Sequence, residues 1–281
     1  MPCGCEICDP ETKYPYCICC PTWKNFDTVL RQIKDVDSDI VSKEFSISTI
    51  TVCAQFNSDV DLETLSNCYF DKIKFNPKCK KTKNKQDESL FYNSLIMKIV
   101  GKYQDFGFIS VKFFPNGKIQ IAGCKSIMSC AYAIRKAYSR VFKNKCFITK
   151  PKITHTKIAM INSDFKINFH LDQDDMCTVL NEFSIHKNKN FTQINYQNCK
   201  YPAINAKAIS LDRVEEFKQF IFDRKGKLAK RKFTNVISVL IFRPGSIILT
   251  GGNDINTYLE IYTLVVKEIL EANIDAVIEK V

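Results

Sequence analysis

Two long segments of this chain alternate apolar and polar residues, as half-buried β-strands do. They are Phe45–Phe56 (FSISTITVCAQF) and Lys157–Phe169 (KIAMINSDFKINF), and each runs into a short segment whose apolar residues have helical spacing. Asp61 and Asp172, 111 residues apart, are counterparts in these junctions. The pattern therefore predicts a strand followed by a short helix at two places in the chain.

A second pattern also occurs twice. The segments Phe113–Ser126 (FFPNGKIQIAGCKS) and Ile241–Asp254 (IFRPGSIILTGGND) each contain an apolar strand ending in Phe, a Pro/Gly turn, an alternating strand and a glycine. Three pairs of residues lie 128 positions apart: Phe114 and Phe242, Gly117 and Gly245, and Gly123 and Gly251. Each block is followed by apolar residues at helical spacing, and Ser126 is placed to cap the first of these helices.

Each repeat is thus predicted to run strand, short helix, several strands and long helix. This order is typical of an α+β fold, in which two repeats build an antiparallel sheet with helices on one face. No helix is left for the other face, and its strands carry Phe, Ile, Leu and Thr, so we expect a binding surface there. The predicted divisions are an N-terminal arm at residues 1–40, repeat one at 41–150 and repeat two at 151–281.

The second repeat contains an insertion. The offset between matched positions grows from 109 to 128 residues, so about 19 extra residues lie around Leu211–Phe233. The first half of this segment is predicted to be a helix, and its second half is strongly basic. Repeat one has its own polar loop at Pro77–Ser89. Contact with phosphate and simple solvation are both open for these two segments.

The formal net charge of the 281 residues is +11, from 41 Lys and Arg against 30 Asp and Glu. This excess favours a polyanionic partner, although a solvated basic surface would give the same composition. No run of 18 apolar residues and no N-terminal signal sequence is present, so neither a membrane span nor secretion is expected. The three His have no metal-binding spacing, and no catalytic motif occurs, so we do not expect an enzyme.

The 14 cysteines fall into two groups. Eight are scattered singly among apolar residues and are expected to be reduced core thiols: Cys53, Cys68, Cys79, Cys124, Cys130, Cys146, Cys177 and Cys199. The other six lie in the first 20 residues, where Cys5 with Cys8 and Cys17 with Cys20 form two CxxC pairs. These four could hold a structural zinc ion, or the arm could be disordered and free of metal. No other cofactor is expected.

The repeated blocks resemble the TATA-box-binding protein (TBP) family. FPNGKIQIAGCKS and FRPGSIILTGGND stand where that family has strand–FxSGK–strand–TGAK–helix, and FNPK (75–78), FYNSLIMKI (91–99) and KYPAINAK (200–207) match its Pro-containing segments. The resemblance covers about residues 45–271. It implies a saddle-shaped, curved antiparallel sheet of ten strands with four helices on the convex face and DNA on the concave face.

The resemblance also implies how DNA would be held. This family is itself the usual illustration of minor-groove binding by inserted aromatic wedges, so the mechanism is carried over from the family. Its wedge positions fall on Tyr92, Phe114, Tyr201 and Phe242. Taken by themselves, Phe114 and Phe242 could instead be core residues under the turns. Its basic positions fall on residues that would reach backbone phosphates: Lys98, Lys118, Lys125 and Lys207.

The centre of the family's DNA surface is altered here. The family's central Asn is replaced by Thr49 in repeat one, and in repeat two Asn162 lies two residues beyond the aligned Met160. Other positions that match apolar or neighbouring DNA contacts are Thr51, Ala122, Ile248 and Thr250. Since A·T readout in the minor groove depends on few groups, these changes leave the sequence preference open, although DNA shape and deformability could still favour TA-rich steps.

The function implied by the resemblance is that of a transcription initiation factor that binds and bends AT-rich promoter DNA as a monomer. Its implied partners are general transcription factors of the B type and the RNA polymerase machinery. The alternative is a protein-interaction adaptor with the same fold and weak or non-selective DNA binding. The composition resembles that of relatives in large DNA viruses, so the implied location is a nucleus or a viral factory.

Overall fold

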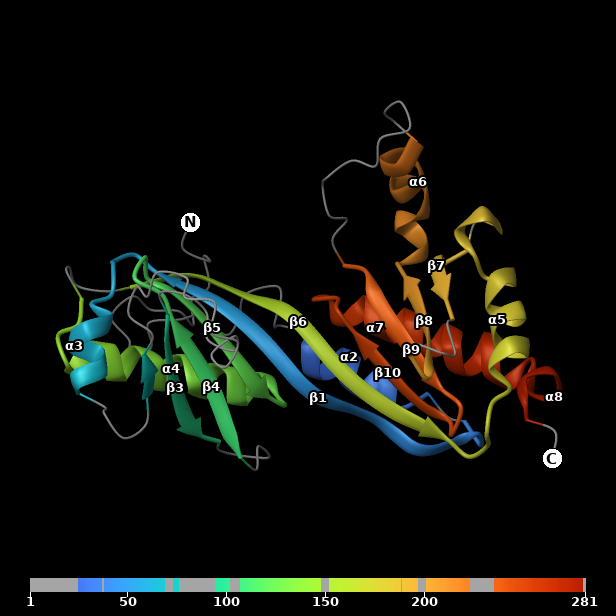
Figure 1. Cartoon of the computed structure of the whole chain (residues 1–281), viewed down its shortest axis with the longest axis horizontal. Coiled ribbons are helices and arrows are strands. Elements are labelled where there is room, and N and C mark those ends of the chain that lie inside the picture. Colours follow the sequence, from blue (N-terminus) through green and yellow to red (C-terminus); the bar gives the residue numbers. More distant parts are fainter. Residues whose placement is uncertain are drawn as a thin grey trace. The chain divides into compact units, whose positions relative to one another are not determined.

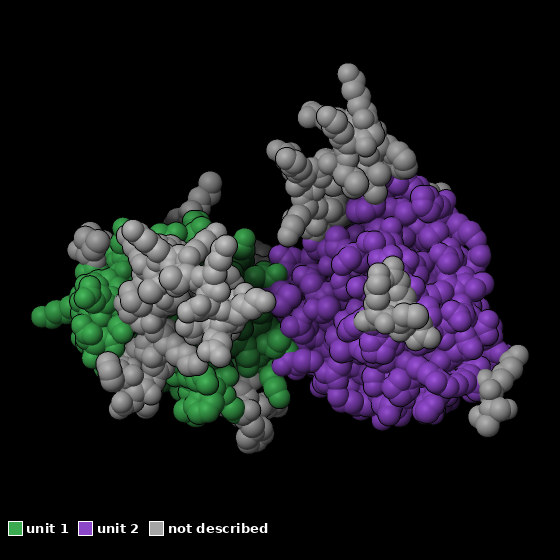
Figure 2. Space-filling model, in the orientation of Figure 1, with its two compact units in different colours: residues 1–25, 49–159 green, residues 26–48, 160–281 purple. Residues whose placement is uncertain are grey.

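The predicted alternation of strands and helices is present in the computed structural model. The structure describes residues 25–36, 38–68, 73–75, 94–101, 107–147, 152–187, 189–196, 201–222 and 235–279. Its described strands have the sheet order β2-β3-β4-β5-β1-β6-β10-β9-β8-β7. The chain divides into two compact units, which Figure 2 shows in different colours: Met1–Asn25 with Thr49–Ala159, and Phe26–Ser48 with Met160–Val281. No described helix is long and apolar enough to cross a membrane.

The first unit contains the strands and helices of repeat one (Figure 1). Its elements are the second part of β1 (Val41–Phe56), α3 (Leu62–Asn67), β2 (Ile73–Phe75), β3 (Leu95–Val100), β4 (Phe108–Phe113), β5 (Lys118–Cys124), α4 (Ile127–Lys143) and the first part of β6 (Ile153–Ile167). Neighbouring strands from β2 to β1 pair antiparallel. Helix α4 packs against β5 and β4 and buries its apolar side, including Ile127, Ile134 and Val141.

The second unit contains the remaining parts of β1 and β6 together with repeat two. Its further elements are α2 (Phe26–Lys34), α5 (Gln173–Glu182), the 3-10 helix η2 (Ile185–Lys187), β7 (Phe191–Asn195), β8 (Ala203–Ala208), the 3-10 helix η3 (Leu211–Arg213), α6 (Val214–Phe222), β9 (Ile237–Phe242), β10 (Ser246–Thr250), α7 (Ile255–Thr263), the π-helix η4 (Leu264–Glu271) and α8 (Ile274–Val277). Tyr262 of α7 packs edge-on against Phe45 and Phe165, with ring centroids 5.3 and 4.9 Å apart.

Corresponding residues of the two repeats form the same backbone hydrogen bonds. The amide of Val60 donates to Pro115 and that of Leu171 donates to Arg243, both at 2.8 Å. Strand register also agrees, because corresponding cross-strand rows are Lys98–Ser110–Ala122 in one unit and Lys207–Ser238–Thr250 in the other. These residues differ by 109 and 128 positions, the offsets found in the sequence. The predicted α+β fold with two repeats in an antiparallel sheet is therefore confirmed.

Asp caps and Gly turns explain why the repeats fold alike. Asp61 accepts hydrogen bonds from the first amides of α3, and Asp172 does so for α5. Gly117 and Gly245 close the two Pro/Gly turns at φ values of 75° and 80°. That backbone conformation favours glycine, since a side chain there would crowd the following carbonyl.

Three features differ from the sequence-based expectations. Residues 26–34, assigned to the N-terminal arm, form α2, which packs against α7 and buries Phe26, Val29 and Ile33. Cys68 is exposed and Cys53 and Cys177 are half-buried, whereas Cys124, Cys130 and Cys146 are buried as expected. The compact units also cut through β1 and β6, while the predicted repeats follow the order of the chain. Packing between distant segments decides all three.

The insertion in repeat two is helical in its first part, as predicted. Residues 211–222 form η3 and α6, and the basic residues that follow lie outside the described part of the chain. The polar loop at 77–89 also lies outside it. Their contact with phosphate stays a prediction.

Candidate nucleic-acid interface

Strand residues that alternate with the buried core residues form a second face of the sheet in each unit, which we call the open face. In β9, Ile237, Val239 and Ile241 are buried, whereas Ser238, Leu240 and Phe242 between them are half-buried. The same alternation holds in β4, β5 and β10. Because the two sets of side chains leave a strand on opposite sides, the open face is the one left for a binding partner.

A polar row crosses the open face of the second unit. The register of β7, β8, β9, β10 and β6 aligns Gln193, Lys207, Ser238, Thr250 and Asn162. The Lys207 ammonium group donates to the Ser238 hydroxyl at 3.1 Å, and the Thr250 hydroxyl donates to the side-chain carbonyl of Asn162. With its carbonyl engaged in this way, Asn162 has its amide N–H groups left to donate to a partner. Ile248 lies half-buried in the neighbouring row.

An aromatic pair stands at one end of this face. Tyr201, two residues before the start of β8, is 46% exposed, and Phe242 is the last residue of β9. Their ring centroids are 6.2 Å apart with an interplanar angle of 61°. The side chain buried in the core is that of the preceding residue, Ile241, and not that of Phe242. The structure therefore brings together two residues that lie 41 positions apart in the chain and that we expected to act as wedges.

The corresponding end of the first unit is described in part. Phe114 follows β4, is half-buried, and accepts a hydrogen bond from Gly117 across the turn at 3.1 Å. Its neighbour Phe113 is fully buried, so Phe113 is the core residue and Phe114 faces outward. Tyr92, the expected partner of Phe114, lies outside the described residues.

The other expected contacts of the first unit differ in their accessibility. Lys98, Lys118 and Lys125 are exposed, and Ala122 is half-buried on the open face. The Thr49 hydroxyl accepts a hydrogen bond from the Gly123 amide at 2.9 Å. Thr51 lies at a bulge in β1 and is only 5% exposed, so we remove it from the set of expected contacts. A one-residue shift in register is enough to bury a side chain in this way.

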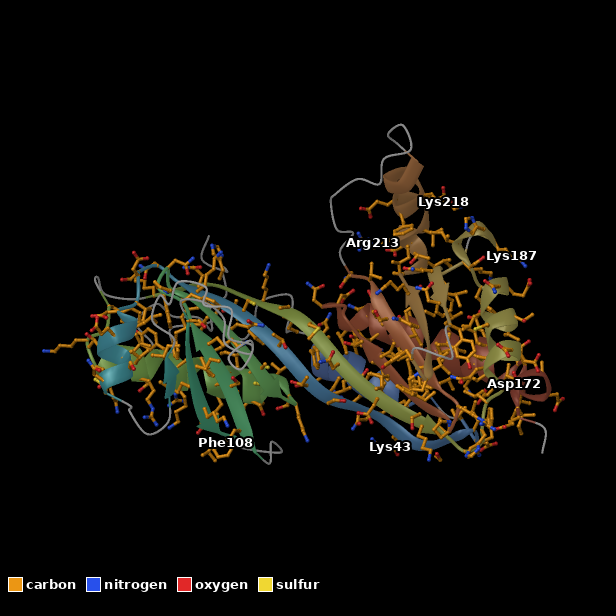
Figure 3. All side chains as sticks on the ribbon, viewed as in Figure 1. Lys43, Phe108, Asp172, Lys187, Arg213 and Lys218 are labelled. Carbon is orange, nitrogen blue, oxygen red and sulfur yellow. The ribbon has the colours of Figure 1, made fainter. Side chains whose placement is uncertain are left out.

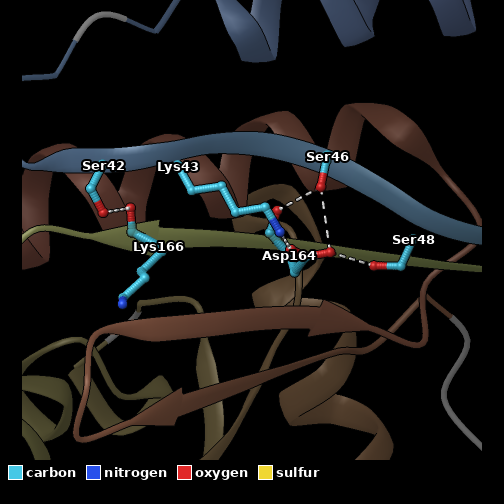
Figure 4. A network of polar contacts seen from close by, with 6 residues as sticks. All are labelled: Ser42, Lys43, Ser46, Ser48, Asp164 and Lys166. Atoms are coloured by element: carbon cyan, nitrogen blue, oxygen red, sulfur yellow. Dashed lines mark hydrogen bonds and ion pairs between the residues drawn. The ribbon is translucent and has the colours of Figure 1, made fainter.

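Sequence reasoning missed an acidic group on the open face. Figure 4 shows Lys43, Ser46 and Ser48 of β1 around Asp164 of β6. Asp164 forms an ion pair with Lys43 and accepts a 2.6 Å hydrogen bond from Ser48 and a longer one from Ser46. It lines a hollow together with Lys166, Ser246 and Ile248. Alternation along β6 could have placed Asp164 on the open face, but its partners depend on the pairing of β1 with β6.

The network holds the Asp164 carboxyl in its charged form. Burial by itself would raise its pKa, but hydrogen bonds from Lys43 and Ser48, the charge of Lys43 and the hydrogen bond from Ser46 together lower the pKa below its ordinary value. Its counterpart in repeat one is Cys53, 111 positions earlier, where burial raises the pKa of the thiol despite Lys157 and Lys118. At this position the second unit therefore carries a negative charge at neutral pH that the first unit lacks.

The predicted metal ligands cannot be placed. Cys5, Cys8, Cys17 and Cys20 lie outside the described residues. Within the described part of the chain, no group of three or more His, Cys, Asp or Glu residues could hold a metal ion. Zinc binding by the arm stays a prediction.

Known proteins are similar to this chain both in sequence and in fold. No family model matches the sequence. A protein named TATA-box-binding protein-like from Acanthamoeba polyphaga mimivirus is 25% identical over 273 residues, which cover 86% of this chain and 69% of the relative. The structure of Methanococcus jannaschii TBP matches with a TM-score of 0.52 at 16% identity, covering 81% of this chain and 99% of that one. The fold of this chain is therefore TBP-like, and its sequence is similar along most of its length to that of a TBP-like protein.

Proposed function

We propose that the chain binds duplex DNA on its open face, through the minor groove, and bends it by inserting aromatic side chains, as a transcription initiation factor does. The observation that carries this proposal is the pairing of Tyr201 with Phe242 at the end of the open face. An aromatic pair beside a turn, partly exposed and outside the core, has the size and place needed to enter a base step.

The polar row supports the same proposal. Asn162 offers N–H donors, and A·T pairs present only acceptors in the minor groove. Lys207 adds a positive charge at the same level of the sheet, where a phosphate would be attracted without regard to sequence. The row thus contains one side chain suited to contact with base edges, Asn162, and one suited to contact with the DNA phosphates, Lys207.

The proposal is tested by measuring DNA bending with the wild type and with a variant that lacks the aromatic pair. Energy transfer between labels at the two ends of an AT-rich duplex should rise when the wild-type chain binds. Tyr201→Ala/Phe242→Ala should retain part of its affinity through phosphate attraction and lose the rise in energy transfer. A GC-rich duplex of the same length shows whether binding depends on sequence.

The matched control is Phe142→Ala, which removes a 48% exposed aromatic side chain from α4 on the helix side of the first unit. It should bend DNA as the wild type does. Equal energy transfer from the double variant and the wild type would contradict insertion by this pair. Binding that is weak, unbent and equal on both duplexes would exclude the DNA function.

One observation favours a second candidate, a protein-interaction adaptor with weak DNA binding. Asp164 places a carboxylate on the open face, where a polyanion would be repelled unless Lys43 keeps it neutralised. In this case the helix-covered face would bind general transcription factors of the B type or RNA polymerase. Failure of the wild-type chain to bend either duplex would lead to this candidate.

A further inference from the structure

Two large apolar side chains are bare on the first unit. Val100 at the end of β3 is 67% exposed, and Phe108 at the start of β4 is 65% exposed. The two residues are direct cross-strand partners, so they form one patch, which we call the Val100–Phe108 patch. Figure 3 labels Phe108 at the start of β4. Exposure of such an apolar pair to water costs free energy. A contiguous exposed apolar patch of this kind marks a surface that contacts a partner.

The same place in the second unit is covered. Val100 corresponds to Ile209 by the offset of 109, and Phe108 corresponds to Val236 by the offset of 128. The register supports this equivalence, because the preceding pairs are Ile99 with Ile109 and Ala208 with Ile237. Ile209 is fully buried, and Val236 is partly buried.

The cover in the second unit is helix α6. Val214 at the start of α6 packs with Ile209 and Ile185 in one apolar cluster, and Phe217 and Val236 pack against it. Val214 and Phe217 lie three residues apart, so they fall on one side of the helix. The polar side carries Glu215 and Glu216, which pair with Lys218 and Arg213. Figure 3 labels Arg213 and Lys218 on this segment.

The insertion found in the sequence explains the difference between the units. The second repeat has about 19 more residues between its third and fourth strands than the first, and these residues include α6. The first repeat joins β3 to β4 by a much shorter connection, closed by a 2.8 Å hydrogen bond from Gly101 to Gly107. Among the residues that the structure describes, the site is therefore covered by α6 in one unit and exposed in the other.

The charge beside the patch indicates what would cover it. The ammonium group of the exposed Lys98 lies 5.6 Å from the centre of the Phe108 ring. In the described part of the chain Lys98 makes no ion pair, whereas its counterpart Lys207 donates to Ser238. A carboxylate at the edge of an incoming apolar surface would complete this arrangement.

We propose that the Val100–Phe108 patch is the docking site for a short amphipathic helix of a partner protein, with acidic residues beside its apolar stripe. The helix would lie on the first unit as α6 lies on the second. Two apolar residues three positions apart would cover Val100 and Phe108, and a neighbouring carboxylate would meet Lys98. By alternation with the buried Ile99 and Ile109, the patch lies on the open face of the first unit, so the test of this proposal is made in the absence of DNA.

The experiment uses the full chain and a probe taken from the chain itself. The probe is a fluorescein-labelled peptide of residues 210–222 (SLDRVEEFKQFIF), held helical by a covalent crosslink on its polar side. Its fluorescence anisotropy should report saturable binding of one peptide per chain, with a weak dissociation constant on the order of 10–100 μM, as expected for a small contact. Val100→Ser/Phe108→Ser should weaken the binding at least about tenfold, because both side chains are removed from the contact.

The matched control is Met128→Ser/Phe142→Ser, which removes two side chains of similar exposure, 49% and 48%, from α4 of the same unit. This variant should bind the peptide as the wild type does. A peptide carrying Val214→Ser and Phe217→Ser should not bind, and Lys98→Ala should weaken binding by a factor of a few.

Three results would overturn the proposal. They are no binding of the peptide to the wild-type chain, equal binding by the wild type and the Val100→Ser/Phe108→Ser variant, and loss of binding in the α4 control. Since the exposed side chains carry little of the fold, the midpoint of urea unfolding of both double variants should match the wild type, which excludes misfolding as the cause. Retained peptide binding by Tyr201→Ala/Phe242→Ala would show that the peptide does not bind at the aromatic pair of the second unit.

Discussion

Gly117 and Gly245 hold corresponding places in the two repeats and approach corresponding carbonyl groups. A Cβ atom at Gly245 would lie 2.6 Å from the Phe169 carbonyl oxygen and 3.0 Å from that of Ile167. At Gly117 the nearest groups are the carbonyl oxygens of Ser58 and Phe56, each 111 positions before its counterpart. The carbonyl oxygens of the two glycines also accept hydrogen bonds from the Phe56 and Ile167 amides, at 2.9 and 3.0 Å. The nearest atom to the built Cβ is in both cases a backbone carbonyl oxygen, which cannot move aside as a flexible side chain can.

We expect Gly245→Ala to lower the free energy of unfolding by roughly 2 kcal/mol or more, since the positive φ and the close carbonyl both oppose a side chain. Urea unfolding measures this change. Gly107→Ala is the control, because Gly107 also has a positive φ, of 133°, but no atom within 4 Å of a built Cβ. Equal effects of the two substitutions would show that the close contact is unimportant.

Asp164 should contribute stability with a defined dependence on pH. Its pKa is lowered in the folded chain, so the contribution is present above the ordinary carboxyl value of about 3.9 and is lost as the pH falls through the lower folded value. We expect Asp164→Asn to lower the free energy of unfolding at pH 7 by less than about 1 kcal/mol, because Lys43 is more than half exposed.

Unfolding of the wild type and of Asp164→Asn by urea at pH 7, 5 and 3 tests this dependence. The difference between them should be the same at pH 7 and 5 and should shrink at pH 3. A difference that grows on acidification would contradict a lowered pKa. Asp175→Asn is the control, since Asp175 is exposed at the start of α5 and its own side chain forms no hydrogen bond in the described part of the chain.

Among the elements, α6 shows how an insertion can be built into a fold. Its apolar side closes a small cluster with Ile185 and Ile209, separate from the core under α7. Helical spacing in the sequence indicated this helix, but the surface that it covers is formed by strand ends that lie on both sides of it in the chain. Helix α2 is the opposite case. It buries three apolar side chains against α7, and its nine residues are too few for a helix to be stable without such packing.

Side-chain truncations in α6 and in the adjoining turn should have different effects on stability, depending on whether the side chain is packed or exposed. Val214→Ala removes two methyl groups from a side chain that is 3% exposed, and we expect it to lower the free energy of unfolding by about 1–2 kcal/mol. Leu211→Ala in the adjoining turn removes a side chain that is 52% exposed and should have almost no effect. Thermal unfolding of the two variants gives the comparison, and a larger effect at Leu211 would contradict the packing of α6.

For the whole molecule, the net charge of +11 sets the expected response to salt. Each phosphate that a lysine neutralises releases counterions, so the affinity for DNA should fall steeply with salt concentration. Lys207→Ala should reduce the slope of log affinity against log salt by about 1, since Lys207 lies in the polar row of the open face.

Lys267→Ala is the control, because Lys267 pairs with Glu271 on η4 in the helix layer. Its salt slope should equal that of the wild type. If the salt slope of Lys207→Ala also equals that of the wild type, Lys207 does not neutralise a DNA phosphate.

Much of the fold could be predicted from the sequence, because it depends on patterns that repeat over a few residues. Alternation predicted β1 and β6, the Pro/Gly turns placed Gly117 and Gly245, and helical spacing predicted α4 and α7. The candidate site was predicted less completely. Lys207, Thr250 and Asn162 were each expected to contact DNA, but their alignment in one row depends on strand register, and the burial of Thr51 depends on a bulge that no local pattern indicates.

The sequence by itself determined that this chain has two copies of one α+β unit and that aromatic residues stand at its turns. Both follow from local spacing, which reflects the 2.0 and 3.6 periods of strands and helices. Only the tertiary structure decided that Tyr201 meets Phe242, that Lys43 neutralises Asp164, and that α6 covers one repeat while the Val100–Phe108 patch stays bare. These outcomes depend on strand register and on the packing of segments far apart in the chain, because a side chain's neighbours across a sheet are set by pairing and not by its position in the sequence.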